Sequence, residues 1–176
     1  EIALAGGGEN FSRGGFVNQK MRWGVVRGAQ AFEDSVEWAY NDPFGHGLMG
    51  VTAENLADDY QYQRDEMDEW SLMSQQRAGA AMHSGFLSRQ ITPIEVPEGR
   101  KSTRIMEHDE FPRPDVSADK LGKLKPVFRK DGKVTPGNSS GVTDGAAFVV
   151  IGERASLESK GSEPLARLVD WTIVGV

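Results

Sequence analysis

Short apolar runs lie near both ends of the chain, and longer polar segments separate them. The runs Ile2–Ala5, Ala146–Ile151 and Leu165–Val174 are apolar and rich in β-branched residues, which is typical of buried strands. Between the last two runs, Arg154–Lys160 has a helical pattern that Gly161 is expected to end. This strand–helix–strand order predicts an α/β core.

The middle of the chain has helical periodicity. Small and apolar residues recur near helical spacing from Arg64 to His83, and Gly85 is expected to end this helix. We expect the apolar stripe to pack against a core. Its members are Met67, Trp70, Ser74, Ala78 and Ala81. The acidic residues of Asp65–Glu69 are predicted to form a solvated helix start and not a metal site, because no histidine accompanies them at ligand spacing.

Local signals predict shorter elements. Thr52 is a candidate N-cap for a helix that follows the loop Asn41–Gly50, and Ser117 is a candidate N-cap for a short helix. The segment Gln90–Val96 alternates like an edge strand, with a proline inside it. The segment Lys101–Pro112 is polar and poorly periodic, so we expect it to be irregular.

Composition narrows the class of protein. The chain has 176 residues, 38% of them hydrophobic, which suits a globular fold, and no apolar run is long enough to span a bilayer. Its net charge of −6 argues against general nucleic-acid binding. It has no cysteine, which excludes disulfides and cysteine-ligated metals and permits a reducing compartment. We therefore expect neither a nucleic-acid partner nor a membrane partner, and a cytoplasmic location, with mitochondria and peroxisomes as alternatives.

The stretch from Lys120 to Val150 combines a basic run with a loop of small residues, Pro136–Gly141. Within the run, only Asp131 opposes the cations. The cations are Lys120, Lys123, Lys125, Arg129, Lys130 and Lys133. Positive charge that leads into a loop with free backbone N–H groups suits an anionic ligand passing close to the backbone. A solvated basic face beside an ordinary turn is the alternative interpretation.

The segment Lys123–Ala147 closely resembles the signature of the thiolase family, the acyl-CoA acetyltransferases and 3-ketoacyl-CoA thiolases. Further matches occur in the expected order, at Ala5–Ser12, Met49–Asn55, Arg64–Glu69 and Asp109–Asp115. The resemblance implies an α/β, thiolase-like fold, in which a loop domain of helices and short strands is flanked by strands of two core halves. It implies that residues 1–13 end the N-terminal core half, 14–141 form the CoA-binding loop domain, 142–162 return to the N-terminal half and 163–176 begin the C-terminal half.

The resemblance also implies roles for individual residues. Arg113 matches a family arginine near the nucleotide end of CoA, and the alternative is a loop arginine in an exposed ion pair. Ser140 and Gly141 match the pair that meets the pantetheine amides. Met49 matches a methionine that lines the acyl pocket, and the alternative is a core methionine.

Three departures from the family pattern affect the predicted acyl-chain preference. Pro136 and Ser139 stand where the family commonly has Ala, and Leu48 stands where many members have His. The proline removes a backbone donor beside the pantetheine arm. His46, two residues before Leu48, is a weak candidate for the missing histidine.

The resemblance implies acyl transfer between CoA thioesters, by Claisen condensation or by thiolytic cleavage of 3-ketoacyl-CoA. The family reaction needs a nucleophilic cysteine, a second cysteine, and the Gly-His-Pro and Asn-Glu-Ala-Phe segments, none of which this sequence contains. We expect them before Glu1 and after Val176, so this chain alone should have no catalytic residue and no activity.

By resemblance, acyl-CoA or CoA is a substrate, no metal or tightly bound cofactor is expected, and the complete protein is expected to form a homodimer or homotetramer. Two alternatives remain. One is a non-catalytic CoA-binding or oligomerisation module, and the other is a degenerate thiolase-like lipid-transfer protein.

Overall fold

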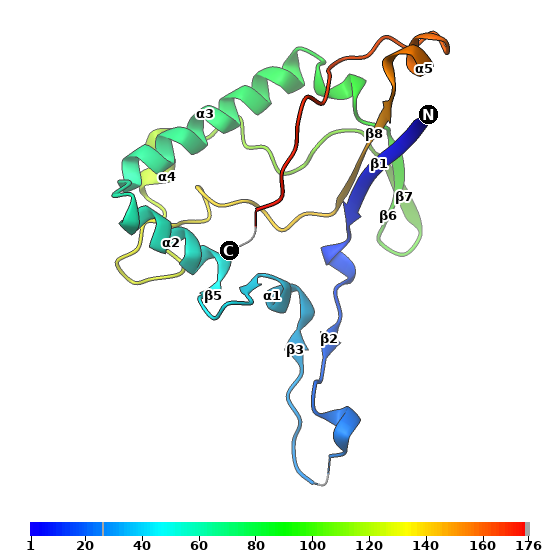
Figure 1. Cartoon of the computed structure of the whole chain (residues 1–176). Coiled ribbons are helices and arrows are strands. Elements are labelled where there is room, and N and C mark those ends of the chain that lie inside the picture. Colours follow the sequence, from blue (N-terminus) through cyan, green and yellow to red (C-terminus); the bar gives the residue numbers. More distant parts are fainter. Residues whose placement is uncertain (26, 175–176) are drawn as a thin grey trace. The chain divides into compact units, whose positions relative to one another are not determined.

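The computed structural model describes residues 1–25 and 27–174. The chain separates into two compact units, one comprising Glu1–Arg13 and Thr143–Val176 and the other comprising Gly14–Val142. Figure 1 labels the elements of both units along the chain. Among the described residues, no helix has the length and apolar character that crossing a membrane requires.

The first unit is built on one antiparallel pair of strands. Strand β1 (Ile2–Glu9) pairs with β8 (Gly145–Gly152), and the two lie side by side in Figure 1. The 3-10 turn η1 (Phe11–Arg13) follows β1, and helix α5 (Arg154–Glu158) follows β8. Both predicted strands and the helix are confirmed, and Gly161 has a φ of +75° at the predicted stop.

Strand β1 continues beyond the apolar run through Gly6, Gly7 and Gly8. An added Cβ at Gly6 would overlap the ring of Phe148 on the partner strand, so the glycine makes room for that ring. The expectation that these strands are buried is wrong for this chain, because a single two-stranded layer leaves both faces open. The exposed fractions of Leu4 and Val150, which face each other across the pair, are 69% and 63%.

The predicted strand Leu165–Val174 is also wrong. This segment is irregular, and its apolar side chains are exposed, with Trp171 73% and Ile173 84% accessible. A strand forms only where another strand satisfies its backbone hydrogen bonds, and no described residue pairs with this segment.

The described residues of the second unit form three short strand pairs and four α-helices. In chain order its elements are β2 (Phe16–Val17), η2 (Met21–Trp23), β3 (Glu33–Asp34), α1 (Ser35–Ala39), β4 (Asn41–Asp42), β5 (Gly47–Leu48), α2 (Met49–Asp59), α3 (Arg64–His83), η3 (Leu87–Arg89), β6 (Ile94–Glu98), β7 (Ser102–Met106) and α4 (Ala118–Gly122). Each strand pairs with the next in sequence: β2 with β3, β4 with β5, and β6 with β7.

Helix α3 has the predicted bounds. Gln63 and Glu66 form a capping box at its start, and Gly85, with a φ of +73°, follows its end. The N-cap predicted at Ser117 is also confirmed, since its side chain accepts a hydrogen bond from the Lys120 N–H at 3.3 Å.

Two local predictions are wrong. Helix α2 begins at Met49 and not after Thr52, because the β4–β5 pair brings the Met49 N–H to the Tyr40 carbonyl, 2.8 Å away. Thr52 lies inside the helix. The segment predicted to be irregular contains β7, which pairs with β6 in a register that sets Val96 opposite Arg104. This ladder relies on backbone pairing, so it needs no apolar alternation.

The most buried residues of the described chain gather where α2, α3, α4 and the loop 126–138 meet. Apart from Gly79, which is buried farther along α3, they are Glu54, Ala57, Asp68, Leu121, Val134 and Thr135. The predicted packing of the apolar stripe on α3 is wrong at Trp70, which is 69% exposed, and the predicted solvation of the acidic start is wrong at Asp68, which is 7% exposed. The face of α3 that packs is polar, because its partners are the backbone groups of a loop.

Candidate functional site

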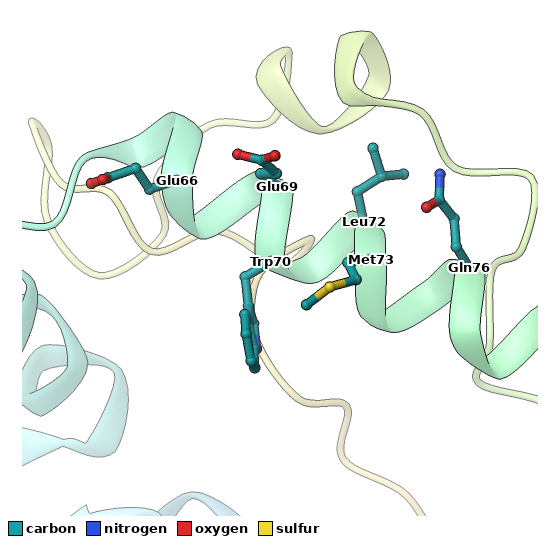
Figure 2. A pocket seen from close by; sticks show the side chains of 6 residues that line it. All are labelled: Glu66, Glu69, Trp70, Leu72, Met73 and Gln76. Atoms are coloured by element: carbon teal, nitrogen blue, oxygen red, sulfur yellow. The ribbon is translucent and has the colours of Figure 1, made fainter.

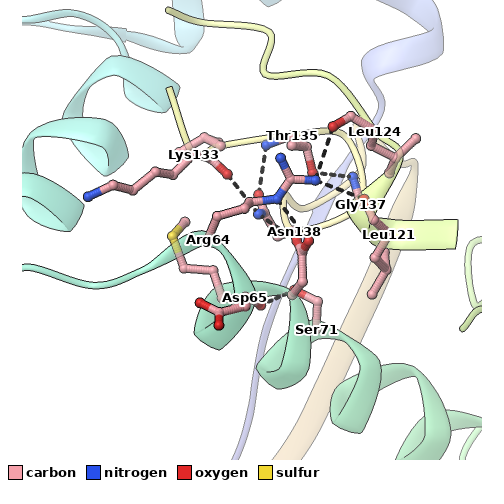
Figure 3. Close-up of polar contacts among 12 residues, drawn as sticks. Arg64, Asp65, Ser71, Leu121, Leu124, Lys133, Thr135, Gly137 and Asn138 are labelled. Carbon is pink, nitrogen blue, oxygen red and sulfur yellow. Dashed lines mark hydrogen bonds and ion pairs between the residues drawn. The ribbon is translucent and has the colours of Figure 1, made fainter. Parts of the chain in front are cut away.

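One face of α3 carries the contacts that organise the loops around the candidate site. Arg64, Asp68, Gln75 and Gly79 recur at spacings of four and seven residues, which puts them along one side of the helix. At the start of this face, the Arg64 Nη2 donates to the carbonyls of Leu121 (2.8 Å) and Leu124 (3.0 Å), as Figure 3 shows. These bonds hold α4 and the residues after it against α3.

Asp68 connects this helix face to the loop that follows the basic run. Its carboxylate accepts hydrogen bonds from the Arg64 Nε (2.8 Å) and from the Asn138 Nδ2 (3.0 Å). Asn138 also donates to the Lys133 carbonyl (3.0 Å) and accepts from the Thr135 N–H (2.8 Å). The side chain of Asn138 therefore ties the turn to itself and to α3.

Glu54 holds the same loop from α2. Its side chain is 1% exposed, and its carboxylate accepts hydrogen bonds from the Lys133 N–H (3.0 and 2.9 Å) and from the Val134 N–H (2.9 Å). An added Cβ at Gly132 would overlap the Glu54 carboxylate, so this position needs glycine for close approach. Two buried carboxylates, Glu54 of α2 and Asp68 of α3, thus hold the loop 126–138 in place through hydrogen bonds.

Much of the basic run is neutralised within the unit. Lys133 lies 3.2 Å from a carboxylate oxygen of Asp58, and Arg129 lies 2.8 Å from the other. The hydrogen bond from Lys133 is the largest cause that holds the Asp58 pKa below its ordinary value, and Arg129 adds to it. These two cations serve the contact between α2 and the loop.

The earlier cations of the run have partners as well. Lys120 pairs with Asp115 at 3.1 Å and lowers the pKa of that carboxyl, and Lys123 pairs with Asp119 at 2.6 Å. Within the described residues, only Lys125 and Lys130 of the run make no ion pair and are exposed. Within the run, Asp131 is the only acidic residue. In the structure, three carboxylates from outside the run pair with its cations, and they belong to Asp58, Asp115 and Asp119.

Arg113 lies in the loop between β7 and α4, on the same side of α3. Its N–H donates to the Gln75 side chain (2.7 Å), and an added Cβ at Gly79 would come within 2.7 Å of Pro114. The Arg113 Nη1 lies 2.6 to 3.1 Å from three backbone carbonyls of its own loop, and the guanidinium lies 5.8 Å from the centre of the Phe111 ring. Its other two guanidinium nitrogens donate to no described residue.

The structure brings Gly141 to this arginine loop. An added Cβ at Gly141 would overlap the Phe111 ring, so that ring has Gly141 in van der Waals contact and Arg113 nearby. Ser140 is exposed, and its hydroxyl bonds to no described residue. Arg113, Ser140 and Gly141 therefore border one surface, and Phe111 joins its two sides.

Met49 is located elsewhere in the unit, at the first residue of α2. It is 52% exposed, so the alternative of a core methionine does not hold here. An added Cβ at the next residue, Gly50, would overlap the ring of Phe128, which belongs to the loop after α4. No hydrogen bond or ring contact of the described residues links Met49 to Arg113 or Gly141.

An open hollow on α3 is a separate feature. Figure 2 shows the side chains that line it, which are Glu66, Glu69, Trp70, Leu72, Met73 and Gln76. Its lining residues all come from one helix, and none is a predicted site residue. Within the described ranges, no cluster of acidic or histidine side chains is arranged to hold a metal ion.

Sequence reasoning missed Phe111, Asp68 and Asn138. Phe111 has no signal of its own, although a glycine at 141 indicates that something bulky approaches there. Asp68 and Asn138 are 70 residues apart, and no local pattern pairs them.

Comparison with known proteins identifies relatives of this chain. Residues 1–155 match the family described as thiolase, N-terminal domain. The β-ketothiolase BktB of Cupriavidus necator is 44% identical over 177 aligned residues, which cover all of this chain and 45% of that protein. The chain thus spans less than half the length of the curated relatives it matches.

Solved structures of similar proteins lead to the same family. The acetyl-CoA acetyltransferase of Bacillus anthracis superposes with a TM-score of 0.84 at 41% identity, over 94% of this chain and 42% of that one. Human mitochondrial 3-ketoacyl-CoA thiolase in complex with CoA superposes with a TM-score of 0.81 at 38% identity, over 94% of this chain and 41% of that one. These matches confirm the resemblance and the α/β thiolase-like fold.

Proposed function

Because this chain belongs to the thiolase family, we propose that it supplies the CoA-binding part of an acyltransferase. The reaction is acyl transfer between CoA thioesters, by Claisen condensation or by thiolytic cleavage of 3-ketoacyl-CoA. Residues 14–141 act as the CoA-binding loop domain, and the flanking segments belong to the two core halves. The observation that carries the proposal is the surface bordered by Arg113, Ser140 and Gly141.

Arg113 binds the nucleotide end of CoA in this proposal. Its Nη1 is occupied by backbone carbonyls, which orients the guanidinium and leaves its remaining N–H groups for an anion. A guanidinium held in this way is suited to the phosphate groups of CoA. Lys125 and Lys130, which have no ion-pair partner among the described residues, add positive charge to the same unit.

Ser140 and Gly141 bind the pantetheine arm. The exposed Ser140 hydroxyl can donate to an amide carbonyl of the arm or accept from an amide N–H. Gly141 lets the Phe111 ring lie against the backbone beside Ser140, and its own N–H and carbonyl groups can bond to the amides of the arm. Met49 contributes to the acyl pocket.

Catalysis needs groups that this sequence lacks. Thiolase chemistry uses a cysteine thiolate to carry the acyl group, and the chain has no cysteine. We therefore expect the chain by itself to bind CoA without transferring acyl groups, and the catalytic protein to be a homodimer or homotetramer. A reducing, cytoplasmic compartment suits a cysteine-dependent reaction.

Titration of two ligands tests the proposed contacts. CoA and an acetyl-pantetheine thioester, which lacks the nucleotide, are titrated into the wild-type chain and into Arg113→Ala and Ser140→Ala. Arg113→Ala should weaken CoA by about 1–3 kcal/mol, as expected for a charge-assisted hydrogen bond, and leave the thioester unchanged. Ser140→Ala should weaken both ligands equally.

The matched control is Arg77→Ala, since Arg77 is exposed on α3 and has no ion-pair partner among the described residues. It should bind both ligands as the wild type does. An Arg113 variant that loses equal affinity for both ligands would show that the arginine shapes the loop and does not bind phosphate. Wild-type protein that binds neither ligand would refute the proposed function.

A further inference from the structure

Two fixed points border the short segment that carries Ser140. On one side, Asn138 is held by hydrogen bonds to Asp68, Lys133 and Thr135. Figure 3 labels Asn138, Lys133 and Thr135 among its polar contacts. On the other side, Gly141 packs against the Phe111 ring.

Only Ser139 and Ser140 lie between these points, and a residue extends the chain by about 3.5 Å at most. The location of the Ser140 hydroxyl therefore follows from where the two points are held.

We propose that Asp68 is a positioning residue for the pantetheine arm of CoA, acting through Asn138 on Ser140 and Gly141. The proposal deepens the proposed function and rests on it. Asp68 is suited to this role because it is 7% exposed and belongs to a helix of 20 residues. The Arg64 Nε lies 2.8 Å from one oxygen of the Asp68 carboxylate, and the Asn138 Nδ2 lies 3.0 Å from the other, so the carboxylate is held in one orientation between them.

Asp68 acts on one end of the ligand only. The Arg113 loop reaches α3 through different residues, Gln75 and Gly79, about 10 Å or more farther along the helix axis at 1.5 Å per residue. Loss of the Asp68 carboxylate should therefore move the Ser140 segment and leave the arginine in place. A purely structural role would weaken the whole surface, including the contact with the nucleotide.

The test compares Asp68→Ala with Asp65→Ala, because Asp65 is exposed on the same helix and, within the part of the chain that the structure describes, bonds only to the adjacent Glu66 N–H. Asp68→Ala should lower the affinity for CoA and for acetyl-pantetheine thioester by the same factor, about tenfold. Asp65→Ala should change neither. Asp68→Asn keeps the side-chain volume and one acceptor, so its affinity for each ligand should lie between the affinities of Asp68→Ala and Asp65→Ala.

Gly79→Ala gives the opposite pattern. Its new methyl group would press on Pro114 beside Arg113, so it should weaken CoA and leave the thioester unchanged. Hydrogen exchange of the folded variants adds a readout that needs no ligand. The Thr135 amide, which donates to the Asn138 side chain, and the Asn138 amide, which donates to the Thr135 carbonyl, should exchange faster in Asp68→Ala, whereas the Val134 amide, held by Glu54, should stay protected.

Two results would overturn the positioning role: wild-type affinity for both ligands in Asp68→Ala, or a loss confined to CoA. If the wild-type chain binds neither ligand, the proposed function fails, and the exchange readout alone decides the positioning role. Unchanged exchange at the Thr135 and Asn138 amides in Asp68→Ala would then reject it.

Discussion

Removing the buried carboxylate of Glu54 should destabilise the second unit more than any other single loss of a polar contact. We consider two substitutions. Glu54→Ala removes both acceptors of the Lys133 and Val134 N–H groups, and Glu54→Gln keeps one oxygen. In the structure, Oε1 alone contacts both N–H groups, at 3.0 and 2.9 Å. Glutamine with its oxygen at the Oε1 position can therefore keep one acceptor for each N–H group, and it loses the charge and the Oε2 bond to the Lys133 N–H.

The magnitudes follow from this geometry. A buried N–H group left without an acceptor costs about 1–3 kcal/mol, so Glu54→Ala should cost about 2–6 kcal/mol for two such groups. Glu54→Gln should cost about 1 kcal/mol, the difference between a charge-assisted and a neutral hydrogen bond. Since domains are typically stable by about 5–15 kcal/mol, the alanine substitution removes a large fraction of the stability, whereas the glutamine substitution removes a small one.

Urea unfolding monitored by hydrogen exchange at the Val134 and Thr135 amides measures this loss in the second unit itself. The control is Glu69→Gln, an exposed glutamate on α3, which should stay within about 0.5 kcal/mol of wild type. From the most to the least stable, the expected order is wild type, Glu54→Gln and Glu54→Ala. Equal stability of Glu54→Ala and wild type would refute the reasoning, because the two N–H groups would then have another acceptor.

Three other predictions concern glycines and pH. Gly141→Ala should displace Phe111 and weaken CoA and acetyl-pantetheine thioester alike by about tenfold, and a titration that finds wild-type affinity would contradict the packing. Gly50→Ala should force the Phe128 ring aside and lower the free energy of unfolding by about 1–3 kcal/mol, which urea unfolding would show as a lower midpoint. An unchanged midpoint would contradict the close contact between Gly50 and Phe128. The Asp58 pKa is lowered in the folded state, chiefly by Lys133, so its ion pair adds stability above the ordinary pKa of 3.8. That stability is lost as the pH falls through the folded-state value. The stability difference between wild type and Asp58→Asn should be present at neutral pH and disappear in acid, and a difference that grows in acid would contradict the assignment.

Helix α3 shows which features of the fold could be predicted from sequence. Its bounds follow from periodicity and from Gly85, which are local signals. Its packed face does not, because the apolar residues of this helix are not the buried ones. Asp68 is buried because Arg64 and Asn138 satisfy it, and Asn138 lies 70 residues away. Trp70 is exposed although it lies in the apolar stripe.

Pairing at a distance explains the other differences. The basic run looked free because its partners Asp58 and Asp115 lie outside it. Strand β7 lacks alternation because its ladder is held by the backbone. The segment Leu165–Val174 has a strand pattern but no described partner to pair with.

The candidate site followed from motif resemblance and not from spacing. Arg113, Ser140 and Gly141 were assigned one ligand by the family pattern, and the structure adds a physical link between them through Phe111. Nothing in the sequence alone places residue 113 beside residue 141. Met49 was assigned in the same way, and its contact with the ligand stays a prediction.

Amide chemical shifts measured while CoA is added would test the central claim most directly. The claim is that this chain binds CoA on the surface bordered by Arg113, Ser140 and Gly141. The account predicts saturable shifts at the amides of these three residues and of Phe111, with the Arg113 shift absent when acetyl-pantetheine thioester replaces CoA. Saturable shifts confined to β1 and β8, or no shifts at millimolar CoA, would contradict it.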